Sequence, residues 1–195
     1  DVVAVLQALL DRHATLRMRV EDDGAGGWSL TVPEPGSVQG ADCLSTAEVI
    51  SDEVLVAARS GLDPAAGVML RAVWVAGTGQ LVVMAHHLAV DGVSWRILLE
   101  DINIAWAQHH SGQPIVLPTG GTSFARWSRL LDAHARTAAV IEQAETWRRT
   151  RARASSADAV ARPLATSRPC TKHCSTITPA SGRMKPRWSP SSARC

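Results

Sequence analysis

Two short apolar segments joined by a glycine-containing turn constrain the fold of this 195-residue chain more than any other feature. Residues 68–75 and 81–85 are rich in aliphatic and β-branched side chains, and Gly77-Thr78-Gly79 lies between them. Such a pair predicts a β-hairpin of buried strands. A buried hairpin needs further elements to cover it, so the rest of the sequence should supply them.

Hydrophobic periodicity elsewhere predicts helices around this hairpin. Spacings of three and four predict helices over residues 2–15, 93–109 and 123–149, and strict alternation predicts strands over residues 16–20 and 28–32. Ser45, with Glu48 three residues later, resembles a capping box for a helix that ends near residue 59. The order α-β-β-α-β-β-α-α is that of an α/β layered sandwich.

The composition changes after about residue 150. Residues 1–150 carry 11 Lys/Arg and 17 Asp/Glu, a net charge of −6, whereas residues 151–195 carry 9 Lys/Arg and only Asp158, a net charge of +8. Of these last 45 residues, 18 are Ser, Thr, Pro or Gly. They offer too little apolar area to offset the entropy of ordering the backbone. We therefore expect one folded region over residues 1–149 and a disordered or frame-shifted tail over residues 150–195.

The heptapeptide HHLAVDG, which begins at His86, follows the second apolar segment directly. Side chains alternate along a strand, so one of His86 and His87 should point into the protein and the other toward an opposing surface. Asp91 is placed either to cap the following helix or to pair with a buried cation, and Gly92 permits a tight or positive-φ backbone. An imidazole with a pKa of about 6.5 is suited to proton transfer. Taken alone, such a pair is usually a strand end, and the nearby Asp91 and Gly92 are what favour a functional site.

This heptapeptide resembles the HHxxxDG core of condensation-type domains of nonribosomal peptide synthetases, which share the chloramphenicol-acetyltransferase fold. Three more segments resemble motifs of that family: ALLDRHATLR (residues 8–17), LDPAAGVMLR (residues 62–71) and TSF followed by Trp127 (residues 122–127). The resemblance covers residues 1–149. It implies the N-terminal lobe only of a chloramphenicol-acetyltransferase-like layered α/β sandwich, whereas the family's active site lies in a channel between two lobes.

The resemblance also implies residue roles. His87 is the catalytic base or acid, and His86 is mainly structural. Asp91 pairs with an arginine from outside this chain and, with Gly92, shapes the loop. Two further residues are candidates for lining the substrate channel, Ser94 and Trp95.

The spacing after the motif indicates a subtype. Peptide-bond-forming members usually have a Trp directly after the DG. Here Val93 and Ser94 lie between Gly92 and Trp95, and this spacing is similar to that of epimerisation domains. That resemblance implies inversion of the Cα of an aminoacyl or peptidyl thioester held on the phosphopantetheine arm of a carrier domain. It implies no directly bound cofactor, and neighbouring synthetase modules as partners.

Two alternatives to epimerisation stay open: a peptide-bond-forming condensation domain, and a catalytically inert fragment or carrier-docking module. Inversion also needs a second proton-handling group, which the family takes from its second lobe. We therefore expect this chain by itself to be inactive.

Other function classes find little support. Cys170, His173 and Cys174 are metal-ligand types, but their spacing leaves no fourth partner for zinc. The arginines of the tail are scattered without a folded platform for nucleic acid. No segment approaches the roughly 20 apolar residues of a membrane span, and nothing directs the chain out of the cytoplasm. Cys43, isolated among apolar neighbours, should be a small core residue.

Overall fold

A computed structural model describes residues 1–158, 173–180 and 183–187 of the chain. The chain forms two compact units. Of the described residues, 1–119, 173–180 and 183–187 belong to one unit, and 120–158 belong to the other. The predicted hairpin and the HHLAVDG segment belong to the first unit.

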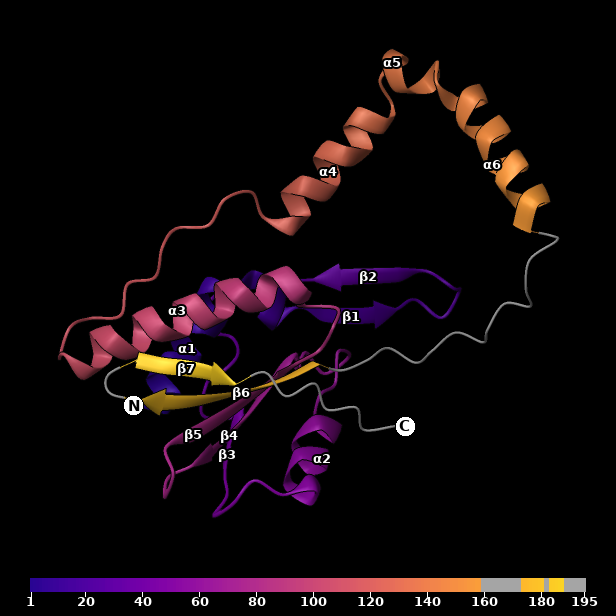
Figure 1. The fold of residues 1–195 in the computed structure, drawn as a ribbon. Helices are drawn as coiled ribbons and strands as arrows, with labels where there is room; N and C mark the ends of the chain where they lie inside the picture. The colour runs from indigo at the N-terminus through magenta and orange to yellow at the C-terminus, as the bar shows by residue number, and fades with distance from the viewer. Residues whose placement is uncertain (159–172, 181–182, 188–195) are drawn as a thin grey trace. The chain divides into compact units, whose positions relative to one another are not determined.

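The first unit is built around a five-stranded mixed sheet of order β3-β4-β5-β6-β7 (Figure 1). Its strands are β3 (Leu44–Thr46), β4 (Leu70–Val75), β5 (Gln80–Ala85), β6 (His173–Ala180) and β7 (Arg183–Arg187). β3 runs parallel to β4, and the other neighbouring pairs are antiparallel. β4 and β5 form the hairpin that the sequence predicts. In its turn the amide of Gly79 donates to the carbonyl of Val75 at 2.8 Å, and Gly79 has a φ of +67°.

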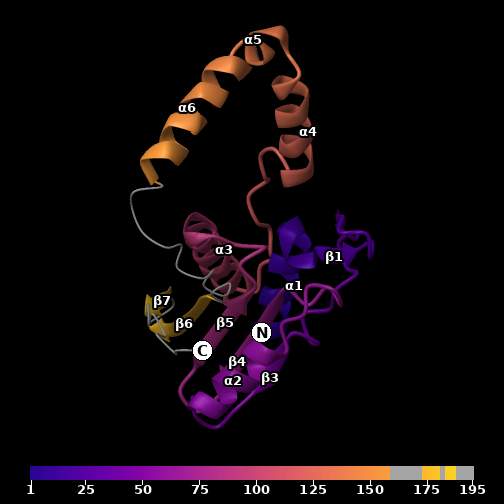
Figure 2. The same cartoon turned by 90° about the vertical axis from the view of Figure 1, so that its right-hand side faces the viewer.

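Helices cover both faces of this sheet (Figures 1 and 2). The helices α1 (Val2–Arg12) and α3 (Gly92–His110) pack on one face, and α2 (Asp52–Ser60) packs on the other. Alternation along β5 divides the core accordingly: Leu81, Val83 and Ala85 join the cluster under α1 and α3, whereas Val82 and Met84 join the cluster under α2. The strand β5 is therefore buried on both faces at the centre of the unit.

The strand predicted from residue 16 begins later than expected. Residues Ala14–Arg17 form a 3₁₀ helix, η1, because Arg17 turns into the protein. Its guanidinium, in a side chain only 4% exposed, donates to the carbonyls of Leu10, Asp11 and Pro33. The hairpin of β1 (Arg19–Asp22) and β2 (Trp28–Thr31) then follows as a separate two-stranded sheet.

The capping box expected at Ser45 is wrong. Residues 44–46 form β3, whose register pairs Leu44 with Ala72 of β4. The helix α2 begins later, after Ser51, whose Oγ accepts a hydrogen bond from the amide of Val54 at 3.4 Å. A three-residue strand is too short to leave a period in the sequence, and it is fixed by its partner strand.

The described part of the second unit, residues 120–158, contains three helices where the sequence predicts one: α4 (Phe124–Ala135), α5 (Ala138–Ile141) and α6 (Ala144–Asp158). The break between α4 and α5 falls at Thr137, which has an extended backbone (φ −71°, ψ 148°). Its Oγ1 donates to the carbonyl of His134 at 2.8 Å. A hydroxyl that bonds the local backbone competes with the helical hydrogen bonds, and this competition ends the helix.

Parts of the expected tail have regular structure. The helix α6 runs across residue 150 to Asp158, and β6 pairs antiparallel with β5 along residues 81–85. The expectation for residues 150–195 as a whole stays a prediction. Residues 159–172, 181–182 and 188–195, and with them Cys170, lie outside the described residues.

Candidate functional site

The histidine pair lies where the central strand β5 ends in a turn, as the sequence predicts. The strand ends at Ala85, and residues 87–89 form the turn. The amide of His86 donates to the carbonyl of Met69 at 2.9 Å, and the carbonyl of His86 accepts from the amide of Ala89 at 2.9 Å. The first bond joins the start of the turn to the residue that precedes β4, and the second closes the turn itself.

The ring of His86 takes part in the turn itself. Its Nδ1 lies 3.2 Å from the amide of Leu88 and accepts that hydrogen bond. Both histidine side chains are half-buried, whereas Leu88 is exposed. A ring that accepts a backbone amide two residues away stabilises the local conformation of the turn.

Asp91 is the N-cap residue of α3. Its Oδ1 accepts hydrogen bonds from the amides of Val93 at 3.0 Å and Ser94 at 2.7 Å, and from the Ser94 hydroxyl at 2.7 Å. The hydroxyl bond, followed by the amide bonds, lowers the pKa of Asp91. The side chain is exposed. Of the two roles that the sequence left open, the geometry of this unit therefore supports capping rather than pairing with a buried cation.

Gly92 begins α3 without a special backbone conformation. It is not among the six glycines that have a positive φ in the described residues. A Cβ added to Gly92 would meet no atom within 4 Å. The positive φ that the sequence allowed is not used, and the position instead leaves open space beside the motif.

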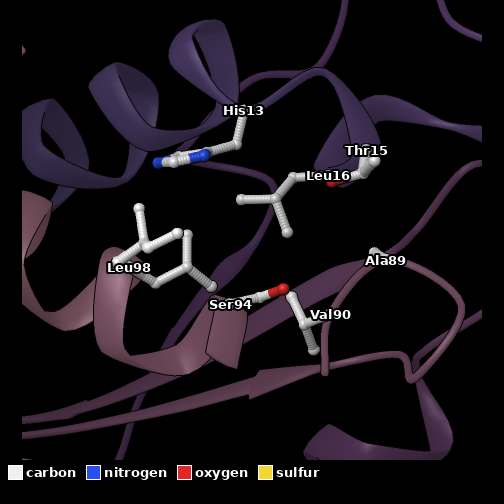
Figure 3. A pocket seen from close by; sticks show the side chains of 8 residues that line it. His13, Thr15, Leu16, Ala89, Val90, Ser94 and Leu98 are labelled. Carbon is white, nitrogen blue, oxygen red and sulfur yellow. The ribbon is translucent and has the colours of Figure 1, made fainter. Parts of the chain in front are cut away.

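Ser94 and Trp95, both expected at a substrate channel, have different surroundings. Ser94 is half-buried and lines a small pocket (Figure 3). Trp95 is 0% exposed and packs in the large core cluster with α1 and β5. Its indole is therefore a core side chain in this structure, which corrects the channel role expected for it. Its Nε1 has no hydrogen-bond partner among the described residues.

The pocket beside Ser94 has a volume of about 90 Å³. It lies between the end of α1, the loop after β5 and the first turns of α3 (Figure 3). Its lining residues are His13, Thr15, Leu16, Ala89, Val90, Ser94, Ile97 and Leu98. Ala89 and Val90 come from the HHLAVDG segment, so the pocket borders the motif directly.

His13 is the polar group that sequence reasoning missed. Its Nε2 lies 2.7 Å from Oδ2 of Asp101 on α3, and the two side chains are 16% and 7% exposed. Burial lowers the pKa of His13, and the hydrogen bond to Asp101 opposes this effect in part. The two residues are 88 positions apart, so no local pattern could have paired them. The signal in the sequence was Asp101, a charged residue between the buried Leu98 and Ile102 on the apolar face of α3.

Neither a metal site nor a membrane-spanning helix is found among the described residues. Among the residues that the structure describes, no group of three or more His, Cys, Asp or Glu side chains could hold a metal ion. No helix in the described ranges is long and apolar enough to cross a membrane. The chemistry offered by the described residues beside the motif is thus that of imidazole, hydroxyl and carboxylate groups.

Comparisons with known sequences agree on one family. Residues 2–175 match the family model of the condensation domain. One subunit of the linear gramicidin synthase of Brevibacillus parabrevis is 32% identical over 154 residues, which cover 73% of this chain and 2% of that protein. Surfactin synthase subunit 2 of Bacillus subtilis (strain 168) is 32% identical over 155 residues, which cover 75% of this chain and 4% of that protein.

Comparisons with solved structures agree on the fold. The epimerization domain from the third module of tyrocidine synthetase B has a TM-score of 0.60 at 24% identity, covering 75% of this chain and 35% of that chain. A structure of condensation-domain-mediated chain release from the enacyloxin polyketide synthase has a TM-score of 0.53 at 22% identity, covering 77% and 30%. The chain therefore spans about a third of these solved chains and a few per cent of the curated relatives. With its mixed α/β fold and its HHLAVDG turn, the chain belongs to the condensation domain family of nonribosomal peptide synthetases.

Proposed function

We propose that this chain is the N-terminal lobe of an epimerisation-type domain, which inverts the Cα of an aminoacyl or peptidyl thioester. The substrate is carried on the phosphopantetheine arm of a carrier domain. The observation that carries the proposal is the position of His86 and His87 at the end of the central strand β5, in a turn that His86 closes with two hydrogen bonds and joins to Met69 with a third. A general acid or base needs such a fixed position to meet a proton on a bound substrate.

Within this proposal His86 and His87 have different roles. His87 exchanges the Cα proton, and His86 holds the turn through its bond from the Leu88 amide. Asp91 holds the first turn of α3 in place, and the open space at Gly92 leaves room for substrate beside the turn. Inversion requires a proton to leave one face of the Cα and another to reach the opposite face. The second proton-handling group comes from the second lobe.

The position of Trp95 supports the epimerisation subtype. Val93, the residue directly after Gly92, is 66% exposed, whereas Trp95 is fully buried. A Trp directly after the DG, as in peptide-bond-forming members, would occupy that exposed position at the start of α3. In this chain the indole is two residues further along and contributes to the core. The surface beside the motif therefore differs from that of a peptide-bond-forming member.

The test is proton exchange in a two-lobe protein. Residues 1–149 are joined to the second lobe of the tyrocidine synthetase epimerization domain, and deuterium uptake from solvent at the Cα of a carrier-bound aminoacyl thioester is measured. His87→Ala should reduce the uptake by about 10²–10⁴-fold, the typical contribution of general acid–base catalysis. His86→Ala should instead lower stability. His86→Asn, whose Oδ1 can replace Nδ1 as the acceptor for the Leu88 amide, should keep the fold and much of the exchange.

The second candidate is peptide-bond formation, which the shared HHxxxDG motif and the condensation family model both favour. The same chimaera distinguishes the two, because a condensation domain would join two carrier-bound substrates without deuterium uptake. That product pattern would overturn the epimerisation proposal. The unmodified 195-residue chain should show no exchange, since the second lobe supplies the other wall of the channel. Deuterium uptake by that chain would show that one lobe suffices.

A further inference from the structure

One face of α3 carries a row of residues directed toward α1 and η1. Ser94, Leu98 and Asp101 are spaced by four and three residues, which places them on a single helical stripe. Ser94 and Leu98 line the pocket, and Asp101 bonds to His13. The row thus connects the N-terminal turn of α3 to the buried hydrogen bond between His13 and Asp101.

The partner of Asp101 is His13, which connects α1 to η1. His13 lies between α1 and η1, as the C-cap of the first and the N-cap of the second, with an extended backbone (φ −100°, ψ 97°). Its ring lines the pocket and meets Asp101 at 2.7 Å (Figure 3 shows the ring of His13 over the pocket). Among the described residues only Arg17 and Asp101 are charged side chains that are buried, and Arg17 is bound by backbone carbonyls. The contact of Asp101 with His13 is therefore a buried charge-assisted hydrogen bond between two helices.

We propose that His13 and Asp101 form a positioning pair, which fixes α3 against α1 and thereby holds the HHLAVDG turn in its working geometry. The inference rests on the proposed function, because it assigns the pair to the turn that carries the reaction. Asp101 lies ten residues after Asp91, or about 15 Å along the helix axis. A helix of this length moves as a unit, so a fixed point at Asp101 also fixes the N-cap.

The contacts of the turn explain how this position is transmitted. Ala89 and Val90 are 8% and 5% exposed and pack in the same core cluster as α1 and α3. Both residues also line the pocket whose other walls are His13 and the stripe of α3. If α3 shifts relative to α1, these two residues lose their packing, and the turn that begins at His86 loses its support.

The chain contains a matched pair for comparison. Nε2 of His109 lies 2.8 Å from Oδ1 of Asp1, and it also connects α3 with the start of α1. The atoms and the distance are almost the same, but these side chains are 33% and 61% exposed. Water competes for exposed pairs, which contribute little to stability. Burial is thus the variable that separates the two pairs.

Amide hydrogen exchange on the full chain tests the proposal. Asp101→Ala should raise the exchange rates of the Ala89 and Ser94 amides at least about tenfold more than those of β4 and β5, because a local opening exposes the turn before the sheet. Asp101→Asn keeps an oxygen that accepts from His13 and should restore most of the protection. His109→Ala should leave all these rates within about threefold of the wild type.

Two results would overturn the positioning role. An equal rise of the exchange rates in the turn and in the sheet would show that the pair only adds global stability. Unchanged exchange rates at Ala89 would show that the pair does not hold the HHLAVDG turn in place. If Asp101→Ala does not fold, His13→Ala removes the same hydrogen bond at a side chain that partly reaches solvent. In the two-lobe chimaera, Asp101→Ala should lower kcat at an unchanged KM, and Asp101→Asn should restore it. A wild-type chimaera without epimerase activity would refute the proposed function and leave the exchange result standing.

Discussion

Replacement of Trp95 tests whether its indole belongs to the core, as the structure has it, or to a substrate channel. The side chain is 0% exposed and is the largest of the fully buried side chains. Truncation of a buried Trp to Ala typically lowers the free energy of unfolding by about 3–5 kcal/mol. Because the buried Nε1 has no hydrogen-bond partner among the described residues, its removal relieves part of this loss. We therefore expect Trp95→Ala to cost about 3 kcal/mol, at the low end of the range.

A second substitution separates packing from the polar group. Trp95→Phe keeps an aromatic ring in the core and removes the unpartnered N–H, so its cost should stay within about 1 kcal/mol. The matched control is Trp28→Ala, because Trp28 on β2 is 68% exposed. A substitution at such a surface position should change stability by at most about 0.5 kcal/mol.

The assay is urea unfolding of the full chain, followed by far-UV circular dichroism. The three variants should share the wild-type m value, so that differences in midpoint report differences in stability. A loss of about 3 kcal/mol is a large part of the 5–15 kcal/mol typical of a domain. If Trp95→Ala and Trp28→Ala have the same midpoint as the wild type, Trp95 is not a core residue and the channel role returns.

Three further predictions follow from the titratable groups and the helix cap. Since burial lowers the pKa of His13 below its ordinary 6.5, the folded chain binds fewer protons than the unfolded chain in this range. Its unfolding free energy should therefore fall as the pH drops from above 6.5 to below the folded pKa, and His13→Gln should remove this part of the pH dependence in parallel urea titrations. Asp91→Ala should lower the melting temperature because it leaves the first amides of α3 uncapped. Asp91→Asn keeps an equally good cap and should not lower it. An equal drop in melting temperature for both variants would mean that the charge of Asp91 matters more than its capping bonds. Burial raises the pKa of Cys43, which is 4% exposed, so peptide mapping should find it alkylated at least about tenfold more slowly in the native chain than in urea; equal rates would contradict its place in the core.

The elements predicted from sequence are those with a strong local signal. Residues 81–85 are continuously apolar and are followed by His86, so the strand and its end at the turn could be predicted from neighbouring residues alone. The apolar spacing of α3 and the capping position of Asp91 were also visible locally. Even the family could be inferred, because the HHLAVDG motif is contiguous.

Local signals failed where a distant partner decides the conformation. Arg17 was expected in a strand, but the carbonyls at the end of α1 draw it inward. Residues 44–46 become β3 only because β4 lies beside them. Thr137 ends α4 through one hydroxyl bond, which competes with a helical pattern that otherwise continues on both sides.

The sequence by itself determined the HHLAVDG motif, the central hairpin and the alternation that gives β5 two buried faces, because each depends on neighbours within a few residues. Only the tertiary structure decided which side chains surround that motif. It placed Trp95 in the core and Ser94 at the pocket, although the two are adjacent, because successive residues of a helix point about 100° apart. It also brought His13 to Asp101 across 88 residues, since the packing of α1 on α3 sets that contact and no periodicity in the chain records it.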